Sequence, residues 1–586
     1  MNIEKARHSL AHVLAEAVQR LFPDAKLGMG PAIENGFYYD FDTEEKISSE
    51  DLKKIQKEMK KILKKKNTEF EYIEVSIEEA ISMFSEKKEH LKLELIEDLK
   101  AQGEEKLGIF KQGNWFDLCR GPHVEKMKDL PFKGFKLDRV AGAYWKSDEK
   151  NKMLTRIYGL AFEDADKLND FIEKREEARK RDHRKLGKEL EIFAFSDLVG
   201  KGLPLLLPKG ATLRRVLERF IVDEELRRGY EHVITPVLGK VDLYKVSGHW
   251  DHYKDSMYNP IDIEGEEFVL RPMTCPHHFE IYKNNQHSYN DLPRRFAEIS
   301  SLFRFEKSGE LSGLIRLRNF TLADAHIICT QQQMKKEFKD VLILLKYIMD
   351  SLGISEKVWY RASLRDDEKG KYVDNDEMWE QSEKVLLEIL DELGWKYEIS
   401  RGDAAFYGPK LDIQIQNVNG KDDTIITNQI DLFLAERFQL EYIDSDGEKK
   451  RPVIIHRSSV GCLERTMAFL IEHYAGALPL WLSPVQIRLL SIADRMNDYV
   501  EEVYEKLQSR GIRVEKDIRN EKLGKKIREA RLMRIPYLAI VGQTEMDNKT
   551  LTIRNRNTGE QKEYSLDEFI DRIILEENKK SLELEL

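Results

Sequence analysis

Histidine and cysteine residues with four-residue spacings occur twice in the N-terminal part of the chain. His8 and His12 are one helical turn apart, so both side chains lie on one face of a predicted helix. Cys119 and His123 have the same separation further along. On spacing alone, HxxxH combined with CxxxH supplies the four ligands of a zinc site. The alternative is a helix that merely packs His8 and His12 on a core.

A second group consists of Cys275, His326 and His456, which lie far apart in the chain. Their separations of 51 and 130 residues match no short metal-binding motif. Spacing by itself therefore favours three unrelated core residues over a metal site. His249, in the segment SGHWDHYKD, is equally typical of an ordinary loop.

Two arginine sites in the middle of the chain suit a nucleotide triphosphate. Arg304 lies in a strand-like run, FRFE, which is followed by a polar loop and by Arg316. An arginine on a rigid strand can hold a phosphate through two hydrogen bonds. Arg465 follows Gly461, which admits close backbone approach, and lies where a helix is expected to begin. Because the sequence has no P-loop and no Rossmann glycine motif, ATP would need another scaffold.

The elements that must position these residues follow from the hydrophobic pattern. Between about residues 192 and 480, strand-like runs follow one another without regular crossover helices. This predicts a largely antiparallel sheet flanked by helices. From Pro484 the pattern becomes strand, helix, strand, helix, strand, which predicts a compact α/β domain of about a hundred residues. The first segment, to about residue 162, mixes helical periodicity with short strand-like runs, and a charged stretch at about 163–191 is typical of a connecting helix.

The composition is that of a globular protein with several domains. The 586 residues suffice for three or four domains, and 41% hydrophobic with 34% charged residues excludes a disordered chain. No apolar run is long enough to span a bilayer, and the first helix lacks the apolar block of a signal peptide. We therefore expect a cytoplasmic protein without a membrane partner. The four cysteines lie far apart, which argues against a disulfide framework.

The charge distribution bears on the kind of partner. A formal net charge of −10 taken alone weighs against a polyanion. However, residues 517–534 hold seven Lys or Arg against three Asp or Glu. Most charged runs are solvated helix faces, and we hold that interpretation for residues 60–66. The 517–534 run is less easily dismissed, because it would give a surface suited to nucleic acid.

Three segments, in the correct order, resemble the motifs of class II aminoacyl-tRNA synthetases: VITP ending at Pro236, FRFE at 303–306 and GCLER at 461–465. Around them, RPMTCPHH, FTLADAHIIC, AAFYGPKLD and VIIHRSSVGCLER resemble threonyl-tRNA synthetases rather than the prolyl, seryl or glycyl enzymes. The resemblance runs from the first residues nearly to the last. It implies an α+β multidomain fold: a class II antiparallel β-sheet core flanked by helices, an N-terminal α+β editing domain and a C-terminal α/β anticodon-binding domain.

The resemblance implies a threonine–tRNA ligase that activates L-threonine with ATP and Mg²⁺, then transfers it to the 3′ end of threonine tRNA. It assigns Arg304 to the α-phosphate and Glu306 to the adenine end of ATP. Arg316 and Arg465 correspond to residues that contact the terminal phosphates. Pro236 corresponds to a residue at the interface of a homodimer.

The same resemblance reverses the interpretation of Cys275, His326 and His456, because these positions correspond to the zinc ligands of the family, with one Zn²⁺ per subunit. Three protein ligands leave open positions, which threonine would fill with its amino nitrogen and hydroxyl. A metal that requires an oxygen ligand would reject valine more strongly than the about hundredfold of a hydrophobic pocket. Asp324, two residues before His326 on the same strand face, would accept a hydrogen bond from the hydroxyl.

Further positions match the surroundings of the reacting groups. His249 matches a histidine that helps to move a proton from the terminal ribose of the tRNA, and Lys410 a nucleotide-side position. Both join Arg304 and Arg465 as expected catalytic residues. Leu322 stands where the family often has Gln, and Cys462 where it often has Ser, so the pocket is expected to differ around them. The expected threonine-binding residues are Met273, Asp324, Tyr407, Gln429 and Cys462.

Zinc cannot reject serine, which keeps the hydroxyl, so a second and hydrolytic site is expected. The segments HSLAHVLAEAV, GPAIENGFYYD and NWFDLCRGPHV resemble the proofreading domain of the threonyl enzymes, which is not considered to need a metal. We therefore expect a metal-free pocket that hydrolyses seryl-tRNA, in which imidazoles and a lysine activate water and bind the terminal ribose. Its expected residues are His8, His12, Lys92, Asp117, Cys119 and His123.

The C-terminal segments resemble the anticodon-binding domain that several class II synthetases share. On that match Asn520, Glu545 and Arg554 contact anticodon bases, since splayed bases of a loop are recognised by hydrogen bonds to their edges. The small ubiquitin-like domain that the family commonly has in front is expected to be absent, because His8 follows only seven residues.

The expected domains are an editing domain at 1–162, a linker helix at 163–191, a catalytic domain at 192–480 and an anticodon-binding domain at 481–586. Two rival interpretations remain. One is an inactive paralogue that binds tRNA as a regulator, against which the intact arginine and zinc-ligand positions argue. The other is a zinc hydrolase built on the four N-terminal His and Cys residues.

Overall fold

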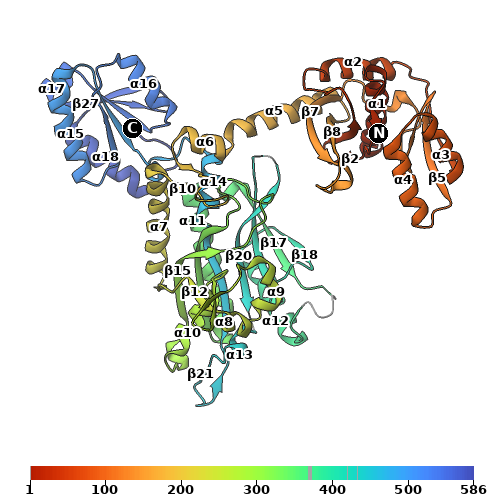
Figure 1. Ribbon diagram of the computed structural model, residues 1–586. Coiled ribbons are helices and arrows are strands. Elements are labelled where there is room, and N and C mark those ends of the chain that lie inside the picture. Colours follow the sequence, from red (N-terminus) through yellow and green to blue (C-terminus); the bar gives the residue numbers. More distant parts are fainter. Residues whose placement is uncertain (1, 367–371, 419, 432) are drawn as a thin grey trace. The chain divides into compact units, whose positions relative to one another are not determined.

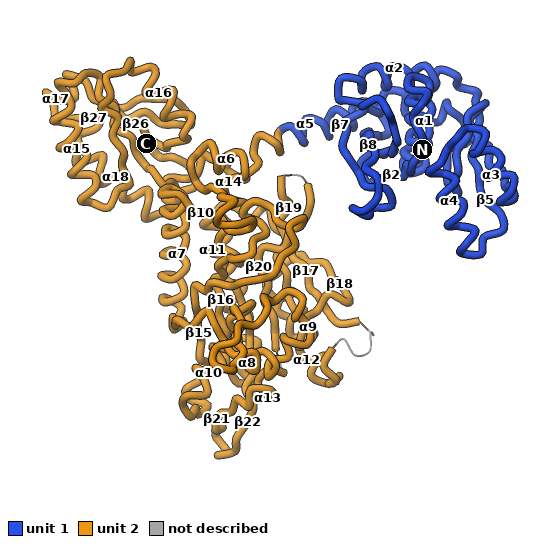
Figure 2. The backbone as a smooth tube through the Cα atoms, viewed as in Figure 1, with its two compact units in different colours: residues 1–176 blue, residues 177–586 orange. Residues whose placement is uncertain are grey.

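The computed structural model of the chain describes residues 2–366, 372–418, 420–431 and 433–586. The chain divides into two units, residues 1–176 and 177–586, which Figure 2 distinguishes by colour. The boundary between the units falls within helix α5 (Ala165–Arg181). Among the described residues there is no helix whose length and apolar character would let it cross a membrane.

The N-terminal unit is built around the buried helix α1 (Ile3–Leu21). Asn2 begins the helix by accepting a hydrogen bond from the backbone N–H of Lys5 at 3.2 Å. The apolar side chains of α1 pack against α2 (Leu52–Leu63) and strand β3 (Gly36–Asp42). Because α1 is buried on more than one side, its histidines are held in place by the core itself.

Two antiparallel sheets complete this unit (Figure 1). The first has the order β1-β3-β8-β7, with β2 paired to β3; the second has the order β4-β5-β6, and α3 (Ile77–Glu86) packs against it and against α4 (His90–Ala101). The expected α+β character of the N-terminal part is thus confirmed. The strand bounds are β1 (Lys26–Leu27), β2 (Ala32–Ile33), β4 (Phe70–Ser76), β5 (Lys106–Gln112), β6 (Trp115–Leu118), β7 (Phe135–Tyr144) and β8 (Met153–Ala161).

The charged stretch after the first unit forms two helices, α5 and α6 (His183–Glu189). The break lies at Asp182, whose extended backbone interrupts the helix and whose carboxylate accepts from the backbone N–H of Arg184 at 2.8 Å. One continuous connecting helix was expected here; the capping aspartate accounts for the difference.

A large, mostly antiparallel sheet forms the middle of the chain, as its sequence pattern predicts. Its central strands are β16 (Asn319–Cys329) and β23 (Val453–Cys462), and every residue of β23 is buried. Among the described strands of this sheet, only the outermost pairs, β11 with β15 and β17 with β18, are parallel. The strand order is β11 (Glu231–His232), β15 (Arg294–Phe303), β16, β23, β20 (Asp422–Asp431), β19 (Lys410–Gln416), β17 (Val358–Leu364) and β18 (Tyr397–Arg401).

Helices cover this sheet and close its core. The helix α11 (Gln331–Leu352) packs on β16 and β23, and so does α14 (Leu463–His473). Thr330 begins α11 with a reciprocal capping box to Gln333, and Gly353 ends it in the left-handed conformation at φ 71°. Other helices of the unit are α7 (Pro208–Arg227), α8 (Val241–Val246), α9 (His249–Tyr253), α10 (Cys275–Lys283), α12 (Asp376–Glu392) and α13 (Leu434–Arg437).

The C-terminal part follows the predicted alternation of strands and helices. Strand β24 (Ile487–Ser491) pairs in parallel with β25 (Val514–Asp517) and β26 (Tyr537–Val541), and two antiparallel strands extend the sheet. The predicted α/β class is therefore correct for this part. The remaining elements are α15 (Asn497–Ser509), α16 (Leu523–Leu532), α17 (Gln543–Asn548), β27 (Thr550–Asn555), β28 (Gln561–Ser565) and α18 (Leu566–Lys579).

Candidate active site

A cavity of about 720 Å³ opens over the central strands of the large sheet. Most of the residues that the sequence singles out in the middle of the chain line this cavity. Lys410 is not among the lining residues: its Nζ lies 3.0 Å from a carboxylate oxygen of Asp412. The expected residues that do line it are His249, Met273, Cys275, Arg304, Glu306, Arg316, Leu322, Asp324, His326, Tyr407, Gln429, His456, Cys462 and Arg465.

Cys275, His326 and His456 come together at one end of the cavity. Cys275 begins α10, whereas His326 on β16 and His456 on β23 face each other directly across the strand pair. One ligand atom from each of the three lies within 4.8 Å of the others, and all three residues are buried. A thiol with two imidazoles is a donor set that fits Zn²⁺.

The distal nitrogen of each histidine in this group is hydrogen-bonded. His456 Nε2 lies 2.8 Å from Oδ2 of Asp431, and His326 Nδ1 lies 2.8 Å from Nδ1 of His278. A metal-binding histidine usually has such a partner, which fixes the ring and leaves the other nitrogen free. Burial raises the pKa of the Cys275 thiol and lowers the pKa of His326, so the apo group is uncharged at these two positions.

The amino-acid side of the cavity lies beside this group. Asp324 shares a strand face with His326, and burial raises the pKa of its carboxyl group. Tyr407 donates a hydrogen bond from its hydroxyl to the side-chain oxygen of Gln429. The two residues that depart from the family pattern, Leu322 and Cys462, are paired across β16 and β23.

Three of the expected arginines line the same cavity. Arg465 begins the α14 region and donates to the backbone oxygens of Ile315 at 3.0 Å and Thr424 at 2.8 Å. Arg316 Nε donates to Glu306 at 2.8 Å. The pKa of Arg304 is lowered by burial and then by the positive charge of Arg465. Because the positive charges of Arg304 and Arg465 repel each other, a bound anion would stabilise the charged form of both.

His249 is a buried residue at the edge of the cavity. Its Nδ1 lies 2.7 Å from the hydroxyl of Ser247. Burial, reinforced by the neighbouring His456, lowers the pKa of His249 to about 3. The imidazole is therefore neutral near pH 7 and has a lone pair that can accept a proton.

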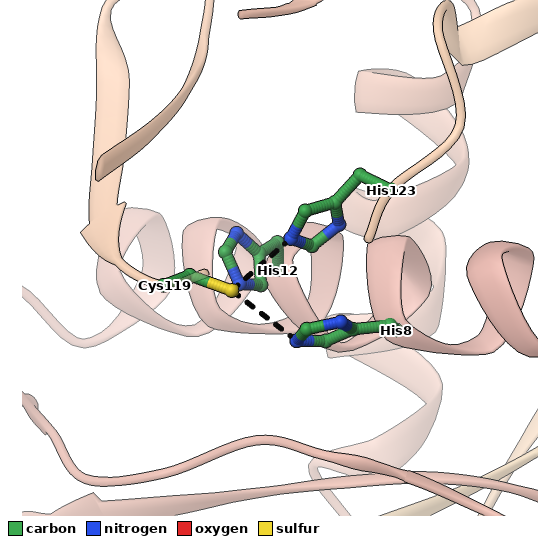
Figure 3. A group of neighbouring side chains, drawn as sticks. All are labelled: His8, His12, Cys119 and His123. Carbon is green, nitrogen blue, oxygen red and sulfur yellow. Dashed lines mark hydrogen bonds between the residues drawn. The ribbon is translucent and has the colours of Figure 1, made fainter. Parts of the chain in front are cut away.

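The four N-terminal candidates, His8, His12, Cys119 and His123, also come together, as Figure 3 shows. Cys119 Sγ lies 3.4 Å from His8 Nε2 and 3.3 Å from His123 Nε2. The carbonyl oxygen of Pro122 can only accept, so His8 Nδ1, at 3.2 Å, carries the proton. His8 Nε2 is then unprotonated and faces the Cys119 thiol.

Burial sets the charge state of this N-terminal cluster. It lowers the pKa of His8, of His12 and of His123, and in the last two the neighbouring histidines lower it further. It also raises the pKa of Cys119 to about 11. The cluster is therefore a set of neutral imidazoles around a protonated thiol.

Lys92 and Asp117 lie beside the cluster as a buried ion pair, with Nζ and Oδ1 2.6 Å apart. Tyr39 donates a hydrogen bond to the second oxygen of Asp117, and His12 Nε2 lies 3.9 Å from that oxygen. Both partners of the pair are 2% exposed. A buried pair with further hydrogen bonds holds its geometry firmly, because separating the charges would leave each uncompensated.

The residues expected to contact the anticodon lie in the C-terminal part. Asn520 is exposed in the loop before α16. Glu545 accepts from Thr552 Oγ1 at 2.7 Å, and Arg554 follows Thr552 by two positions on the same face of β27. Glu545 and Arg554 are thus near one surface.

Comparisons with known proteins cover nearly the whole chain. Residues 253–474 match the tRNA synthetase class II core domain (G, H, P, S and T), and residues 483–576 match an anticodon binding domain. Residues 108–158 match the threonyl and alanyl tRNA synthetase second additional domain. The threonine–tRNA ligase of Clostridium perfringens strain SM101 is 54% identical over 572 residues, which are 97% of this chain and 88% of that protein. The chain belongs to the threonine–tRNA ligase family.

Other members of the threonine–tRNA ligase family are similarly close. The ligase of Geobacillus sp. strain WCH70 is 52% identical over 96% of this chain and 87% of its own length. A crystal structure described as the RNA binding domain of threonyl-tRNA synthetase from Cryptosporidium parvum Iowa II is 37% identical, with a TM-score of 0.64, and covers 69% of this chain and 99% of that chain. A putative threonyl-tRNA synthetase structure from Aeropyrum pernix is 26% identical with a TM-score of 0.61, and covers 69% of this chain and 98% of that chain.

Several residues of this threonine–tRNA ligase family member were not found by sequence reasoning. His278 contacts His326, and Tyr39 contacts Asp117. His183 in α6 donates from Nδ1 to Glu472 at 2.7 Å and accepts from the backbone N–H of Leu314 at 3.1 Å, in the loop before Arg316. The only available signals were the HH doublet three residues after Cys275 and the histidine in RDHRK.

The N-terminal cluster predicts a pH-dependent stability. The folded unit keeps His12 neutral, whereas the unfolded chain binds a proton near the ordinary pKa of 6.5. Stability is therefore present above that pH and is lost as the pH falls, by about 2 kcal/mol for His12 at pH 5. Hydrogen exchange of α1 amides in the full chain, corrected for intrinsic rates, should show lower protection at pH 5 than at pH 7.

The His12→Gln variant should reduce this pH dependence, because it removes one group that must stay neutral. The matched variant is Leu21→Gln, in the last turn of the same helix, where the leucine is 39% exposed; it changes no titratable group and should leave the dependence unchanged. Protection of α1 that is equal at both pH values would contradict the neutral state of the cluster.

Proposed function

We propose that this chain is a threonine–tRNA ligase with two active sites. It activates threonine with ATP, transfers it to the 3′ end of threonine tRNA, and hydrolyses seryl-tRNA in its N-terminal unit. The observation that carries the proposal is the buried group of Cys275, His326 and His456 in the same cavity as Arg304 and Arg465. Metal-ligand chemistry and phosphate-binding chemistry thus meet in one site.

The amino acid would be selected at the metal-binding end of the cavity. Zn²⁺ held by Cys275, His326 and His456 would supply open coordination positions for the amino and hydroxyl groups of threonine. Asp324 lies beside these ligands and accepts a hydrogen bond from the threonine hydroxyl. Valine is nearly isosteric but has no hydroxyl, so it would leave both the metal and Asp324 without an oxygen partner.

ATP would bind at the arginine end. Arg304 and Arg465 contact its phosphates, Arg316 the terminal phosphate, and Glu306 the adenine end, with Mg²⁺ bound to the triphosphate. The lowered pKa of Arg304 beside Arg465 supports this placement, because a triphosphate would compensate the two positive charges. Neutral His249 accepts the proton of the tRNA ribose hydroxyl during transfer, with Lys410 on the nucleotide side.

Amino-acid activation gives the first test. ATP–pyrophosphate exchange should be strong with threonine, measurable with serine and near background with valine. The Cys275→Ala variant should lose both its zinc and nearly all exchange, because one of three ligands is gone. Exchange and metal content are measured on the same preparation.

The matched control for this test is Cys329→Ala. Cys329 is a buried cysteine that also belongs to the core, at the end of β16, but it does not line the cavity. This variant should keep zinc and activity. An active, zinc-replete Cys275→Ala variant, or equal exchange with valine, would remove the proposed zinc site.

The N-terminal unit would clear the remaining error. Serine keeps the hydroxyl, so the synthetic site cannot exclude it. His8 and His12 offer neutral imidazoles that can take a proton from water, and Cys119 with His123 closes the cluster around them. Lys92, held by Asp117, supplies a positive charge for the terminal ribose. We propose that this reaction needs no metal; the same four residues are also a possible metal-ligand set, and the experiment below distinguishes the two.

A double variant tests the editing site. His8→Ala with His12→Ala should leave threonine activation and tRNA charging intact and abolish hydrolysis of seryl-tRNA, so that Ser-tRNA accumulates. The control is His90→Ala, an exposed histidine of the same unit. Normal clearance of seryl-tRNA by the double variant would refute the editing site. Zinc that is bound beyond one per chain, and whose removal stops deacylation, would instead support a zinc hydrolase.

The anticodon of the tRNA would lie on the C-terminal part, where Asn520, Glu545 and Arg554 contact its bases and the basic run at 517–534 holds the backbone. We propose that residues 1–162 form the editing domain, 163–191 the linker, 192–480 the catalytic domain and 481–586 the anticodon-binding domain. The protein would act in the cytoplasm.

The active protein would be a homodimer formed through the sheet edge at β11. Ile234, two residues after the end of β11, is 96% exposed, and Val237 and Leu238 just beyond Pro236 are also exposed. Exposed apolar side chains that are contiguous in the chain at a sheet edge are typical of a protein interface. A second copy of this chain fits this edge, because pairing the same edge of two copies would bury the exposed apolar side chains of both.

Sedimentation velocity tests the homodimer. The wild-type chain should sediment as a dimer, and Ile234→Asp should shift it to the monomer, because a buried unpaired charge at an interface costs several kcal/mol. The control is Ile399→Asp on β18, at the other edge of the sheet, where the isoleucine is 52% exposed. A monomeric wild-type chain at micromolar concentration would refute the dimer.

A further inference from the structure

A buried chain of hydrogen bonds leads away from His326. His326 Nδ1 lies 2.8 Å from His278 Nδ1, and His278 Nε2 lies 3.3 Å from Oε2 of Glu298. The carboxylate of Glu298 in turn accepts from Thr235 Oγ1 at 2.7 Å and from Arg271 at 2.9 Å. None of these side chains is more than 9% exposed. The groups come from α10, β15 and β16 (Figure 2), from the segment after β11 and from the residue after β14 (Glu266–Leu270).

With a single proton on His278, the donors and acceptors along this series of hydrogen bonds permit one assignment of protons. Glu298 is charged: although burial alone would raise the pKa of its carboxyl group, the bonds from His278 and Thr235 and the charge of Arg271 lower it to about 2. A carboxylate only accepts, so His278 Nε2 carries a proton. In a neutral His278 the Nδ1 is then an acceptor, and His326 Nδ1 must be the donor.

We propose that His278 is a positioning residue of the metal site: by accepting the Nδ1 proton of His326, it keeps the Nε2 lone pair of His326 free to bind the metal. This inference rests on the zinc site of the proposed function. His278 itself is not a ligand, because both of its ring nitrogens are already bonded. The role of His278 for His326 corresponds to that of Asp431 for His456, which lies at 2.8 Å.

The charges near His326 explain why a histidine occupies position 278. A carboxylate placed next to His326 would bring a negative charge toward Asp324, which is already buried with a raised pKa. Because His278 donates to Glu298 through Nε2, its Nδ1 can accept from His326, and no negative charge lies next to His326. Thr235, beside Pro236, and Arg271, directly after β14, fix Glu298, so the ring of His278 is held at both nitrogens.

The test compares full-length variants loaded with zinc and, separately, with cobalt(II). His278→Phe keeps a ring but removes the acceptor, so zinc should be released to a chelator about 10- to 100-fold more readily. Cobalt(II) affinity, followed by the absorption of the Cys275 thiolate complex, should fall by the same factor. His278→Asn, whose side-chain oxygen can take the place of Nδ1, should restore most of the affinity.

The matched control is His287→Phe. His287 is also buried and bonds the carbonyl oxygen of Tyr282 at 2.9 Å, away from His326. It should bind both metals like the wild type. The inference is overturned if His278→Phe retains zinc like the wild type. It is also overturned if His278→Phe and His278→Asn bind the metals equally weakly. A wild-type chain that binds no zinc refutes the proposed zinc site, whereas a zinc-replete wild type with an unchanged His278→Phe refutes only the role of His278.

A second variant covers a failure of His278→Phe to fold, judged by circular dichroism. Glu298→Gln keeps the shape of the side chain, but its amide can donate to His278 Nε2. That favours the tautomer protonated at Nδ1, which opposes His326 Nδ1–H. Zinc should then be held about tenfold more weakly, and unaltered binding by this variant overturns the inference.

Discussion

The pairing register between β16 and β23 is the constraint on which the large cavity depends. It sets His326 opposite His456 and Leu322 opposite Cys462, with an irregularity between Leu322 and Asp324. Because side chains alternate between the two faces of a strand, a slip of one residue would turn all of them to the other face. The wholly buried β23 resists such a slip, since the slip would exchange apolar and polar groups in the core. The packing of the core around β23 therefore fixes the positions of His326 and His456 relative to each other.

The two His and Cys clusters contain the same residue types but differ in what surrounds them. In the large sheet, each histidine bonds an outer partner, Asp431 or His278, and directs its other nitrogen inward. In the N-terminal unit, Cys119 bonds the imidazoles of His8 and His123 themselves. There too His8 and His123 have outer partners, the carbonyl oxygen of Pro122 and the hydroxyl of Ser9, but their other nitrogens lie within hydrogen-bond distance of the thiol. The inward contacts of the rings, and not the residue types, therefore distinguish the two clusters.

Much of this architecture could be predicted from the sequence. The strand runs and their lack of crossover helices indicated the antiparallel sheet, and the alternation after Pro484 indicated the α/β part. Spacing alone failed for Cys275, His326 and His456, since one helix and two strands bring together residues that are up to 181 positions apart. Only the resemblance grouped these three residues. The break at Asp182 was missed because a capping aspartate looks like any charged residue of a helix.

Residues that act through others were the least predictable. His278, Tyr39 and His183 carry no motif of their own, and their partners Glu298, Asp117 and Glu472 lie on other elements. A hydrogen bond between distant segments leaves no periodicity in the sequence. Such residues become visible only when the fold has placed both partners, so a sequence reveals reacting groups more readily than the groups that orient them.

The turn between β23 and α14 has a consequence for how this cavity can change during evolution. Gly461 has φ 69°, and a Cβ atom there would lie 1.8 Å from the carbonyl oxygen of Ile425. Any side chain at this position would displace the backbone that leads to Arg465. Cys462, the next residue, points its thiol toward Glu464 at 3.3 Å, and a residue of similar size can replace it without moving the main chain. The two neighbouring positions thus differ in tolerance: a side chain at Gly461 would clash with the main chain of Ile425, whereas a substitution at Cys462 would change the polarity of the pocket.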